Sequence, residues 1–432
     1  MSSALLIIER NEQILSLLYQ ENRLVQVKVH EDSLNKQNKV GEDSLSSLPL
    51  NAIYIGKVKN VVPSIDAAFV EVTNGKMGFL SMKNAKNPII VNRKYDGRIV
   101  AGDEILVQIE KEAIKTKDPG LTCNLSFTGK YCVLTTGKLG VAFSSKLDRN
   151  TKDFLKETLE NLKIEDILQE EKVGLVVRTN AAGLLPDNEC NLQLGSTESD
   201  TIKSENNGFQ EINLFQKEFE NLLEQKIKIL SSVPYRTCFS CLYQPMEGYL
   251  TDIRDTYEDS FDKIITNRED IFHRIREEFP TMKNVELYKD ERISLEKLYS
   301  VETRIKEALD ERVWLKSGAY LIIQQTEALT VIDVNSGKIQ KKNPKDDIYF
   351  EINKETAREI ALQLRLRNLS GIIIIDFINQ NTKEQDTQLL AYLSSLVKKD
   401  SVKTTVVDMT PLGLVEVTRK KIHKSLREQL KL

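Results

Sequence analysis

Hydrophobic positions in this chain fall into uninterrupted runs, alternating runs, and runs with apolar residues three and four apart. Two uninterrupted runs, LTVIDVNSG (329–337) and GIIIIDFIN (371–379), contain the aspartates Asp333 and Asp376. Short apolar runs between turn-forming residues predict strands that are buried on both faces. An ionised carboxylate in such a strand is costly unless it has a partner. Both aspartates therefore require one.

Neither of these two runs contains a basic residue that could serve as that partner. Carboxylates at the exits of neighbouring strands are well placed to share a divalent metal through oxygen ligands. Such a site favours metal-assisted chemistry on phosphoryl groups. The alternative is that each Asp is a turn former that bonds its own backbone. Asn335, two residues after Asp333, favours the metal site.

The other patterns outline the organisation of the chain. Strand-like segments 4–9 and 23–30 come first, and the polar stretch 30–47 separates them from a glycine-punctuated β region that starts near Ala52. A second polar stretch, 196–210, predicts a surface loop or linker. Segments 212–230 and 260–279 have helical periodicity. From about Val313 onward, strands and helices alternate as in an α/β unit.

The β region, 55–82, has short alternating strands with tight glycine turns and two phenylalanines, Phe69 and Phe79. Small neighbours would leave these rings accessible, as in OB-fold barrels that stack unpaired bases. The segment 102–127, the expected end of the same barrel, adds Lys111, Lys115 and Lys117. The alternative is that both rings belong to the core, where most phenylalanines lie.

Composition narrows the class of protein. The 432 residues suffice for two to four domains. An apolar content of 40% with 29% charged residues is typical of a soluble globular protein. The start of the chain lacks the pattern of a secretory signal, no stretch is long enough to span a bilayer, and we expect a cytoplasmic protein. The net charge of −3 excludes a global basic field, so any binding of nucleic acid must come from local patches.

The five cysteines suit reduced thiols in a reducing compartment. Cys238 and Cys241 form a CxxC, but no second pair or suitably spaced histidine accompanies it, so a zinc site is not expected. The surrounding segment, 233–245, instead predicts a strand.

In their order and amino-acid sequence, these segments resemble the catalytic region of the ribonuclease E/G family of endoribonucleases, over about residues 4–425. The region 55–82 resembles the family's S1-type RNA-binding domain, and GLVVRTNAAG (174–183) resembles its 5′-end sensor. The segment TEALTVIDVNSG, followed by IALQLRLRNLSGIIIIDFIN, resembles its nuclease centre.

The resemblance implies roles for individual residues. Asp333 and Asp376 match the carboxylates that hold a catalytic Mg²⁺, and Asn335 matches the amide that orients that site. Arg178 and Thr179 match residues that bind a 5′-terminal monophosphate. The matched RNA-contacting positions of the barrel are Phe69, Phe79 and Lys117.

Other basic positions support or weaken this assignment. The loop 336–345 carries Lys338, Lys341, Lys342 and Lys345, which would position the RNA backbone. Lys403 stands where the family leads us to expect an arginine near the sensor, and SSKL (144–147) replaces a more basic sensor loop. Both changes should weaken phosphate capture, because lysine lacks the bidentate fork of arginine. The resemblance implies a homodimer or homotetramer. Family members share a zinc ion across the dimer through a cysteine pair, and no such pair follows residue 425 here, which argues against a zinc link between subunits.

The expected fold is a multidomain α/β chain. An RNase H-like domain receives an inserted S1-type OB-fold β-barrel and a 5′-sensor, and a DNase I-like α/β domain follows. The predicted boundaries are 1–48 for the N-terminal part of the RNase H-like domain, 49–127 for the barrel, 128–210 for the sensor region, 211–312 for the rest of the RNase H-like domain, and 313–432 for the DNase I-like catalytic domain.

The function implied is a Mg²⁺-dependent endoribonuclease that hydrolyses single-stranded RNA to 5′-phosphate and 3′-hydroxyl ends. It would prefer 5′-monophosphorylated substrates and act in rRNA and tRNA processing and in mRNA decay. The alternative is a non-catalytic RNA-binding or scaffold protein that keeps the barrel and the sensor.

Overall fold

The computed structural model describes residues 3–31, 48–113, 117–184, 198–256, 261–280, 282–337, 348–380 and 382–430, with backbone alone at residue 31 and residues 198–211. The chain divides into two compact units. Unit 1 comprises Met1–Ser44 and Glu247–Leu432, and unit 2 comprises Leu45–Met246. The predicted linker at 30–47 lies almost entirely outside the described residues.

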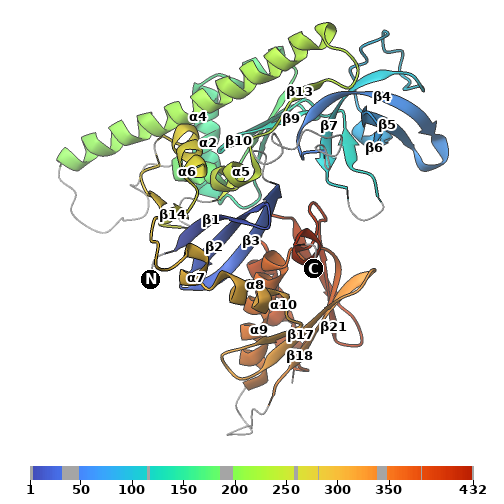
Figure 1. Ribbon diagram of the computed structural model, residues 1–432. Helices are drawn as coiled ribbons and strands as arrows, with labels where there is room; N and C mark the ends of the chain where they lie inside the picture. Colours follow the sequence, from blue (N-terminus) through green and yellow to red (C-terminus); the bar gives the residue numbers. More distant parts are fainter. Residues whose placement is uncertain are drawn as a thin grey trace. The chain divides into compact units, whose positions relative to one another are not determined.

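Unit 2 contains a closed five-stranded barrel (Figure 1). Its strands are β4 (Ile53–Val62), β5 (Ala67–Thr73), β6 (Lys76–Ser81), β7 (Glu104–Lys111) and β8 (Gly120–Thr122). The order β4-β5-β6-β8-β7 closes through the pairing of β4 with β7, and β6 runs parallel to β8. This is the connectivity of an OB-like barrel, which confirms the prediction of that element.

Alternation along the strands fills the barrel. Ala68, Val70 and Leu80 point inward and are fully buried. Where strands approach closely, the chain uses glycine: a Cβ on Gly78 would lie 2.6 Å from the Leu121 side chain. The residues between these inward positions consequently form the outer surface of the barrel.

A second sheet in unit 2 comprises β9 (Ser126–Thr128), β10 (Cys132–Thr135), β11 (Gly140–Phe143) and β12 (Gly174–Val177), in the order β11-β12-β10-β9. It packs against α2 (Arg149–Asn161), α3 (Ile164–Glu170) and α4 (Glu198–Ser232) around Phe127, Phe215 and Phe219. Figure 1 shows α4 as a long continuous helix.

The expected loop at 196–210 is therefore wrong from residue 198 onward, because those residues continue α4. They contain no proline, and adding a turn to an existing helix is much easier than nucleating a new one. The helix predicted at 212–230 is confirmed as the later part of α4.

Unit 1 begins with a sheet in the order β15-β14-β1-β2-β3. Its strands are β1 (Ala4–Arg10), β2 (Gln13–Gln20), β3 (Arg23–Glu31), β14 (Lys263–Thr266) and β15 (Val285–Leu287). The sequence patterns missed β2 entirely. The helix expected at 260–279 is wrong in its first part, which forms β14, and helix α6 (Glu269–Glu278) begins only after it.

The remaining sheet of unit 1 has the order β16-β17-β18-β19-β21-β20. Its strands are β16 (Arg312–Trp314), β17 (Tyr320–Gln325), β18 (Leu329–Asn335), β19 (Gly371–Asp376), β20 (Thr404–Met409) and β21 (Leu414–Arg419). Helices α9 (Ile348–Leu366) and α10 (Lys383–Val397) pack against one face of this sheet. The opposite face, called here the open face, carries half-buried and exposed side chains. The expected alternation of strands and helices from Val313 is thus confirmed.

Several short elements complete the described structure. They are α5 (Gly248–Asp255), α7 (Leu295–Leu298), α8 (Val301–Leu309), α11 (Leu426–Gln429), β13 (Cys241–Tyr243), and the 3-10 helices η2 (Pro63–Ile65), η3 (Met82–Asn84), η4 (Thr179–Leu184) and η6 (Val233–Tyr235). Among the described residues, no helix combines the length and the apolar character that crossing a membrane requires.

Candidate functional site

Asp333 and Asp376 lie side by side on the open face of the C-terminal sheet. Strands β18 and β19 run parallel, and their register pairs the two aspartates directly. Neighbouring strands lie about 4.8 Å apart, so two carboxylates at paired positions can reach a common cation. The two apolar runs predicted neighbouring strands that each carry an aspartate, and the structure places these two aspartates next to each other.

The expectation that both strands are buried on two faces is wrong. Along β18, buried Ile332 and Val334 alternate with half-buried Asp333 and Asn335. Asp376 at the end of β19 is exposed. Helices cover only one face of the sheet, and β-branched residues occupy the open face as readily as the core. The aspartates therefore retain access to solvent and do not bear the cost of complete burial.

Asn335 lies beside the pair. Its Nδ2 donates a hydrogen bond of 2.7 Å to Oδ2 of Asp333, which holds that carboxylate in one orientation. Among the described residues, neither Asp333 nor Asp376 forms an ion pair with a basic side chain. Mg²⁺ is bound in proteins by one or two carboxylates and otherwise by water. The donor set therefore fits a divalent cation.

Among the described residues, no third His, Cys, Asp or Glu side chain joins the two aspartates as a ligand. No group of three or more His, Cys, Asp or Glu side chains within the described ranges could hold a metal ion. A cavity of about 170 Å³ opens just beyond Asp376, at the carboxyl end of β19. It is lined by Phe377, Ile378, Asn379, Gln380, Asp386, Leu389, Met409 and Gly413. Ligands of α/β sheets commonly bind outside this end of the strands.

Sequence reasoning missed Asn353, which fixes the segment after Asp376. This fully buried residue of α9 donates from Nδ2 to the carbonyl oxygen of Ile378 at 2.7 Å and accepts the Ile378 N–H at 3.2 Å. The sequence gives no local sign of this role, because the asparagine and its partner are 25 residues apart.

The barrel presents Phe69 and Phe79 on its outer surface. They are register partners on β5 and β6, their ring centroids are 5.9 Å apart, and the rings meet edge to face at 73°. Both are half-buried and alternate with inward residues, so they do not belong to the barrel interior. In OB-folds this part of the surface contacts oligonucleotides.

The same cross-strand row continues to a lysine. Phe79 pairs with Gly120 on β8, and Gly120 pairs with Lys111 on β7. Lys117 is exposed and lies three residues before Gly120. Lys111, also exposed, therefore extends the aromatic pair with positive charge. Lys115 lies outside the described residues.

Arg178 and Thr179 follow β12 in unit 2. The guanidinium of Arg178 donates from Nη1 to the carbonyl oxygen of Gly129, and its backbone N–H donates to Tyr131 at 2.7 Å. The hydroxyl of Thr179 lies 2.9 Å from that of Ser144, the first residue of the SSKL segment. The structure thus joins the two segments expected to form the sensor, and it also gives Arg178 a local structural task.

A carboxylate supports the same turn from α4. Glu218 accepts the backbone N–H groups of Lys130, Tyr131 and Cys132 at 2.7, 2.8 and 3.0 Å. Burial, followed by the charge of Glu218, raises the pKa of the Cys132 thiol well above its usual range. This thiol is consequently held in its neutral form.

The other basic residues of the prediction are less informative. Lys403 is exposed and precedes β20 in unit 1, whereas Arg178 and Thr179 belong to unit 2. Lys338, Lys341, Lys342 and Lys345 lie outside the described residues.

The CxxC pair does not resemble a metal or redox site. Sγ of Cys238 approaches the carbonyl oxygen of Ile55 at 3.9 Å, and Sγ of Cys241 approaches that of Tyr243 at 3.4 Å. Burial raises the pKa of both thiols. Only Cys241–Tyr243 forms a strand, so the longer strand expected at 233–245 is wrong: its first part forms η6.

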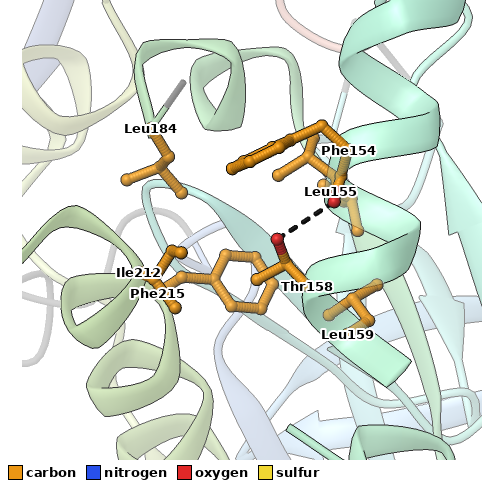
Figure 2. A pocket seen from close by; sticks show the side chains of 8 residues that line it. Phe154, Leu155, Thr158, Leu159, Leu184, Ile212 and Phe215 are labelled. Atoms are coloured by element: carbon orange, nitrogen blue, oxygen red, sulfur yellow. Dashed lines mark hydrogen bonds between the residues drawn. The ribbon is translucent and has the colours of Figure 1, made fainter. Parts of the chain in front are cut away.

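An apolar hollow lies beneath the strand that precedes Arg178 (Figure 2). Side chains of α2, β12, η4 and α4 line it, among them Phe154, Leu184 and Phe215. Its one hydroxyl, that of Thr158, donates to the Phe154 carbonyl oxygen at 3.0 Å. The hollow offers no charge and no spare donor to a phosphate, and so it belongs to the core.

Unit 1 also contains a buried polar cluster that resembles a catalytic triad only in composition. Nε2 of His30 lies 3.1 Å from the Ser16 hydroxyl and 2.7 Å from Oδ2 of Asp252. A nucleophile relay needs the two ring nitrogens to face different partners. Here one nitrogen faces both, and Lys28 bonds the other carboxylate oxygen. The cluster is structural.

Comparison with known proteins points to one family. Residues 201–422 match the Ribonuclease E/G family. Ribonuclease E of Synechocystis sp. is 30% identical over 396 residues, which are 89% of this chain and 54% of that protein. Ribonuclease G of Salmonella typhimurium is 30% identical over 393 residues, 88% of this chain and 74% of that protein. Ribonuclease G of Escherichia coli K12 is 29% identical over 396 residues, 88% of this chain and 74% of that protein.

The chain thus spans about half the length of the first relative and about three quarters of the other two. The family match covers the open face with its two aspartates, and the alignments with the relatives extend over most of both units. On these grounds, the chain belongs to the ribonuclease E/G family of enzymes.

Proposed function

We propose that this chain is a Mg²⁺-dependent endoribonuclease that hydrolyses single-stranded RNA. The observation that carries the proposal is the direct pairing of Asp333 with Asp376 on parallel strands, with Asn335 bonded to the first of them. A protein that only binds RNA has no use for two adjacent carboxylates on its surface, because they repel the phosphate backbone.

The residues of the chain have separable tasks in this reaction. Asp333 and Asp376 would hold the cation, and the Asn335 amide keeps Asp333 in position. When bound, a divalent cation polarises the phosphate oxygens and neutralises the charge that develops on them. Asn353 maintains the segment after Asp376 through its two bonds to Ile378.

Hydrolysis at this site would leave a 5′-phosphate and a 3′-hydroxyl. No histidine lies among these site residues to act as the base that draws the 2′-hydroxyl into attack. Chromatography and mass spectrometry of the products test this point. Products that end in a 2′,3′-cyclic phosphate would overturn the proposed reaction.

The barrel would bind the unpaired strand. Phe69 and Phe79 offer ring edges and faces for base stacking, and Lys111 and Lys117 offer positive charge for phosphates. Stacking accepts every base, which suits an enzyme that acts on single strands of varied sequence. Precursors of rRNA and tRNA and mRNA in decay are the substrates we propose.

The preference for a 5′-monophosphate would come from Arg178 and Thr179. A terminal monophosphate has more charge and more acceptor oxygens than an internal diester, and a guanidinium with a neighbouring hydroxyl can bind it. The contact between Thr179 and Ser144 supports a common site for the two segments. Equal cleavage rates on 5′-hydroxyl and 5′-monophosphate RNA would refute this preference.

The decisive experiment uses a short AU-rich oligonucleotide with a 5′-monophosphate. Cleavage should require Mg²⁺, stop with EDTA, and disappear in Asp333→Asn, whereas Asp290→Asn, an exposed aspartate elsewhere in unit 1, should cleave normally. Metal-independent cleavage, or equal activity of both variants, would contradict the proposal.

The alternative is a non-catalytic RNA-binding protein. The outward aromatic pair of the barrel favours it as much as it favours the enzyme, since both must bind RNA. The oligonucleotide experiment separates them: RNA binding without metal-dependent cleavage under any condition would identify the scaffold.

Further features of the proposal concern the setting and the fold. The described cysteines are free thiols, which suits a cytoplasmic enzyme. We expect a homodimer or homotetramer, which light scattering tests. For the two sheets of unit 1, RNase H-like and DNase I-like remain the predicted fold names.

A further inference from the structure

The open face carries an exposed aromatic pair that the proposed reaction does not use. Trp314 on β16 is 63% exposed, although tryptophan is normally well buried. Its ring centroid lies 5.0 Å from that of Tyr320 on β17, with the ring planes at 53°. The guanidinium carbon of Arg312 lies 5.7 Å from the Trp314 centroid and 4.8 Å from the Tyr320 centroid.

Strand register puts this group on the same face as the aspartates. Trp314 pairs with Tyr320, and Tyr320 pairs with Asn335. In the adjacent row, Arg312 pairs with Ile322, and Ile322 pairs with Asp333. Paired residues share a face, and two strand spacings amount to about 10 Å. Arg312 and Trp314 therefore lie about that far from Asp333 and Asn335 across a continuous surface.

The residues between the two groups are largely apolar. Ile322 and Tyr320 are half-buried and separate the aromatic and basic residues from the carboxylates. Val331, which is 36% exposed, and Ile372, which is 52% exposed, continue the apolar surface on β18 and β19. Contiguous exposed apolar surface of this kind marks a binding site.

The chemistry of this group matches a nucleotide. An indole and a phenol ring offer faces on which a base can stack, and a guanidinium that lies against them can also meet a phosphate. Among the described residues, Arg312 makes no ion pair with a carboxylate that would consume its charge.

We propose that Trp314, Tyr320 and Arg312 form a platform that stacks one base of the bound RNA strand close to the phosphate cut at Asp333 and Asp376. The inference rests on the proposed function, because it concerns the same substrate. It adds a residue set on the nuclease sheet itself that positions the strand. Binding at the barrel and binding at this platform are separate contacts to one RNA.

The protein supplies its own reporter, because Trp314 is its only tryptophan. A base stacked on an indole quenches its fluorescence. The measurement uses the whole chain in EDTA, which prevents cleavage, with single-stranded oligonucleotides whose binding is followed independently by anisotropy. Saturating RNA should quench the emission, and one oligonucleotide in a series with single abasic positions should bind without quenching.

A cleavage assay provides the functional readout. In the wild type, an abasic residue at that one position should raise KM roughly five- to 150-fold, the range expected for one stacked base. Trp314→Ala should raise KM on intact RNA by a similar factor and show no further loss on the abasic substrate. Trp314→Phe should recover most of the affinity. The matched control is Tyr235→Ala, which removes an 87% exposed tyrosine of unit 2. It should change neither KM on intact RNA nor the effect of the abasic residue.

Failure of the platform and failure of the enzyme give different results. If the wild type binds RNA without quenching, or if Trp314→Ala keeps the abasic profile of the wild type, the platform is wrong even when cleavage is normal. If no metal-dependent cleavage occurs but quenching and the abasic effect persist, the nuclease proposal fails and the platform stands. Quenching or a spectral shift that follows protein concentration instead of RNA would identify a protein interface and overturn the inference.

Discussion

The side chain of Arg178 donates a hydrogen bond to the carbonyl oxygen of Gly129, across two segments that are far apart in the chain. The residue proposed to read the 5′ end of RNA therefore also supports the turn before β10. Glu218 of α4 supports the same turn by accepting three backbone N–H groups.

Arg178→Ala should therefore have two effects. It should abolish the preference for 5′-monophosphorylated over 5′-hydroxyl RNA, and it should lower the free energy of unfolding by about 1 to 3 kcal/mol, because a charge-assisted hydrogen bond is lost. Cleavage rates on both substrates and urea unfolding measure these effects. A loss of stability with an unchanged preference would mean that Arg178 is only structural.

Thr179→Val should separate the two tasks. The valine preserves the shape of Thr179 but removes the hydroxyl that contacts Ser144. We expect the 5′-monophosphate preference to fall several-fold with little change in stability. Thr237→Val is the matched control, because Thr237 is an exposed threonine of unit 2, away from the sensor segments, whose hydroxyl contacts that of Ser240. If Thr179→Val retains the full preference, Thr179 does not belong to the sensor.

Asn335→Ala should weaken cleavage without weakening RNA binding. The amide orients Asp333 through its 2.7 Å hydrogen bond. Loss of such a supporting partner typically lowers metal affinity or activity by about 10- to 100-fold, and we expect a loss of activity in that range. Titration of cleavage with Mg²⁺ should give a higher half-saturating concentration. Gln324→Ala, exposed on β17, should leave the titration curve unchanged.

Phe69→Ala and Phe79→Ala should each weaken the binding of single-stranded RNA. Loss of one stacked base predicts an increase in Kd of roughly five- to 150-fold. Both side chains lie on the outer surface, so the barrel should remain folded. Fluorescence anisotropy measures Kd, and Tyr95→Ala, another exposed aromatic of unit 2, should match the wild type. Unchanged binding in both phenylalanine variants would place the RNA elsewhere.

Asp252 predicts how stability depends on pH. Burial alone would raise the pKa of this carboxyl, but the charges and hydrogen bonds of Lys28 and His30 outweigh it and hold the pKa well below its ordinary value of 3.8. A lowered pKa in the folded state contributes stability above pH 3.8, and this contribution is lost as the pH falls below it toward the folded-state pKa.

Asp252→Asn should consequently destabilise the protein by about 1 to 3 kcal/mol at pH 7, because the charge that Lys28 and His30 face is lost. The Lys28 side chain is 40% exposed, so solvent screens part of this effect. The difference from the wild type should shrink below pH 3.8. Urea unfolding at pH 7 and pH 3 measures it, with Asp290→Asn as the exposed control. A difference that is independent of pH would contradict the electrostatic explanation.

Part of the fold and of the site could be predicted from the sequence. Strands β5 and β6 of the barrel were predictable because buried and half-buried side chains alternate along most of each strand, as at Ala68 and Val70 in β5. The aspartate-bearing strands β18 and β19 were predictable from their apolar runs. The exposure of one face of these strands was not predictable, because a run of isoleucines is compatible with a strand covered on one face or on both.

Other features depend on information that local patterns do not contain. Strand β2 was missed because its flanking turns have positive φ at Asn11, Glu12, Glu21 and Asn22, without the glycine that usually marks such hairpins. Trp314, Tyr320 and Asn335 come from three strands, and only the antiparallel register of those strands brings them into one row. The contact of Asn353 with Ile378 likewise depends on tertiary packing.

The pairing of Asp333 with Asp376 is set by backbone hydrogen bonds between β18 and β19, which residues of almost any kind can form. Mutations in the surrounding side chains can therefore accumulate without moving the two carboxylates apart. A pair of carboxylates held together in this way is robust to sequence drift. Backbone pairing of this kind can keep two carboxylates adjacent even at the roughly 30% identity that separates this chain from its relatives.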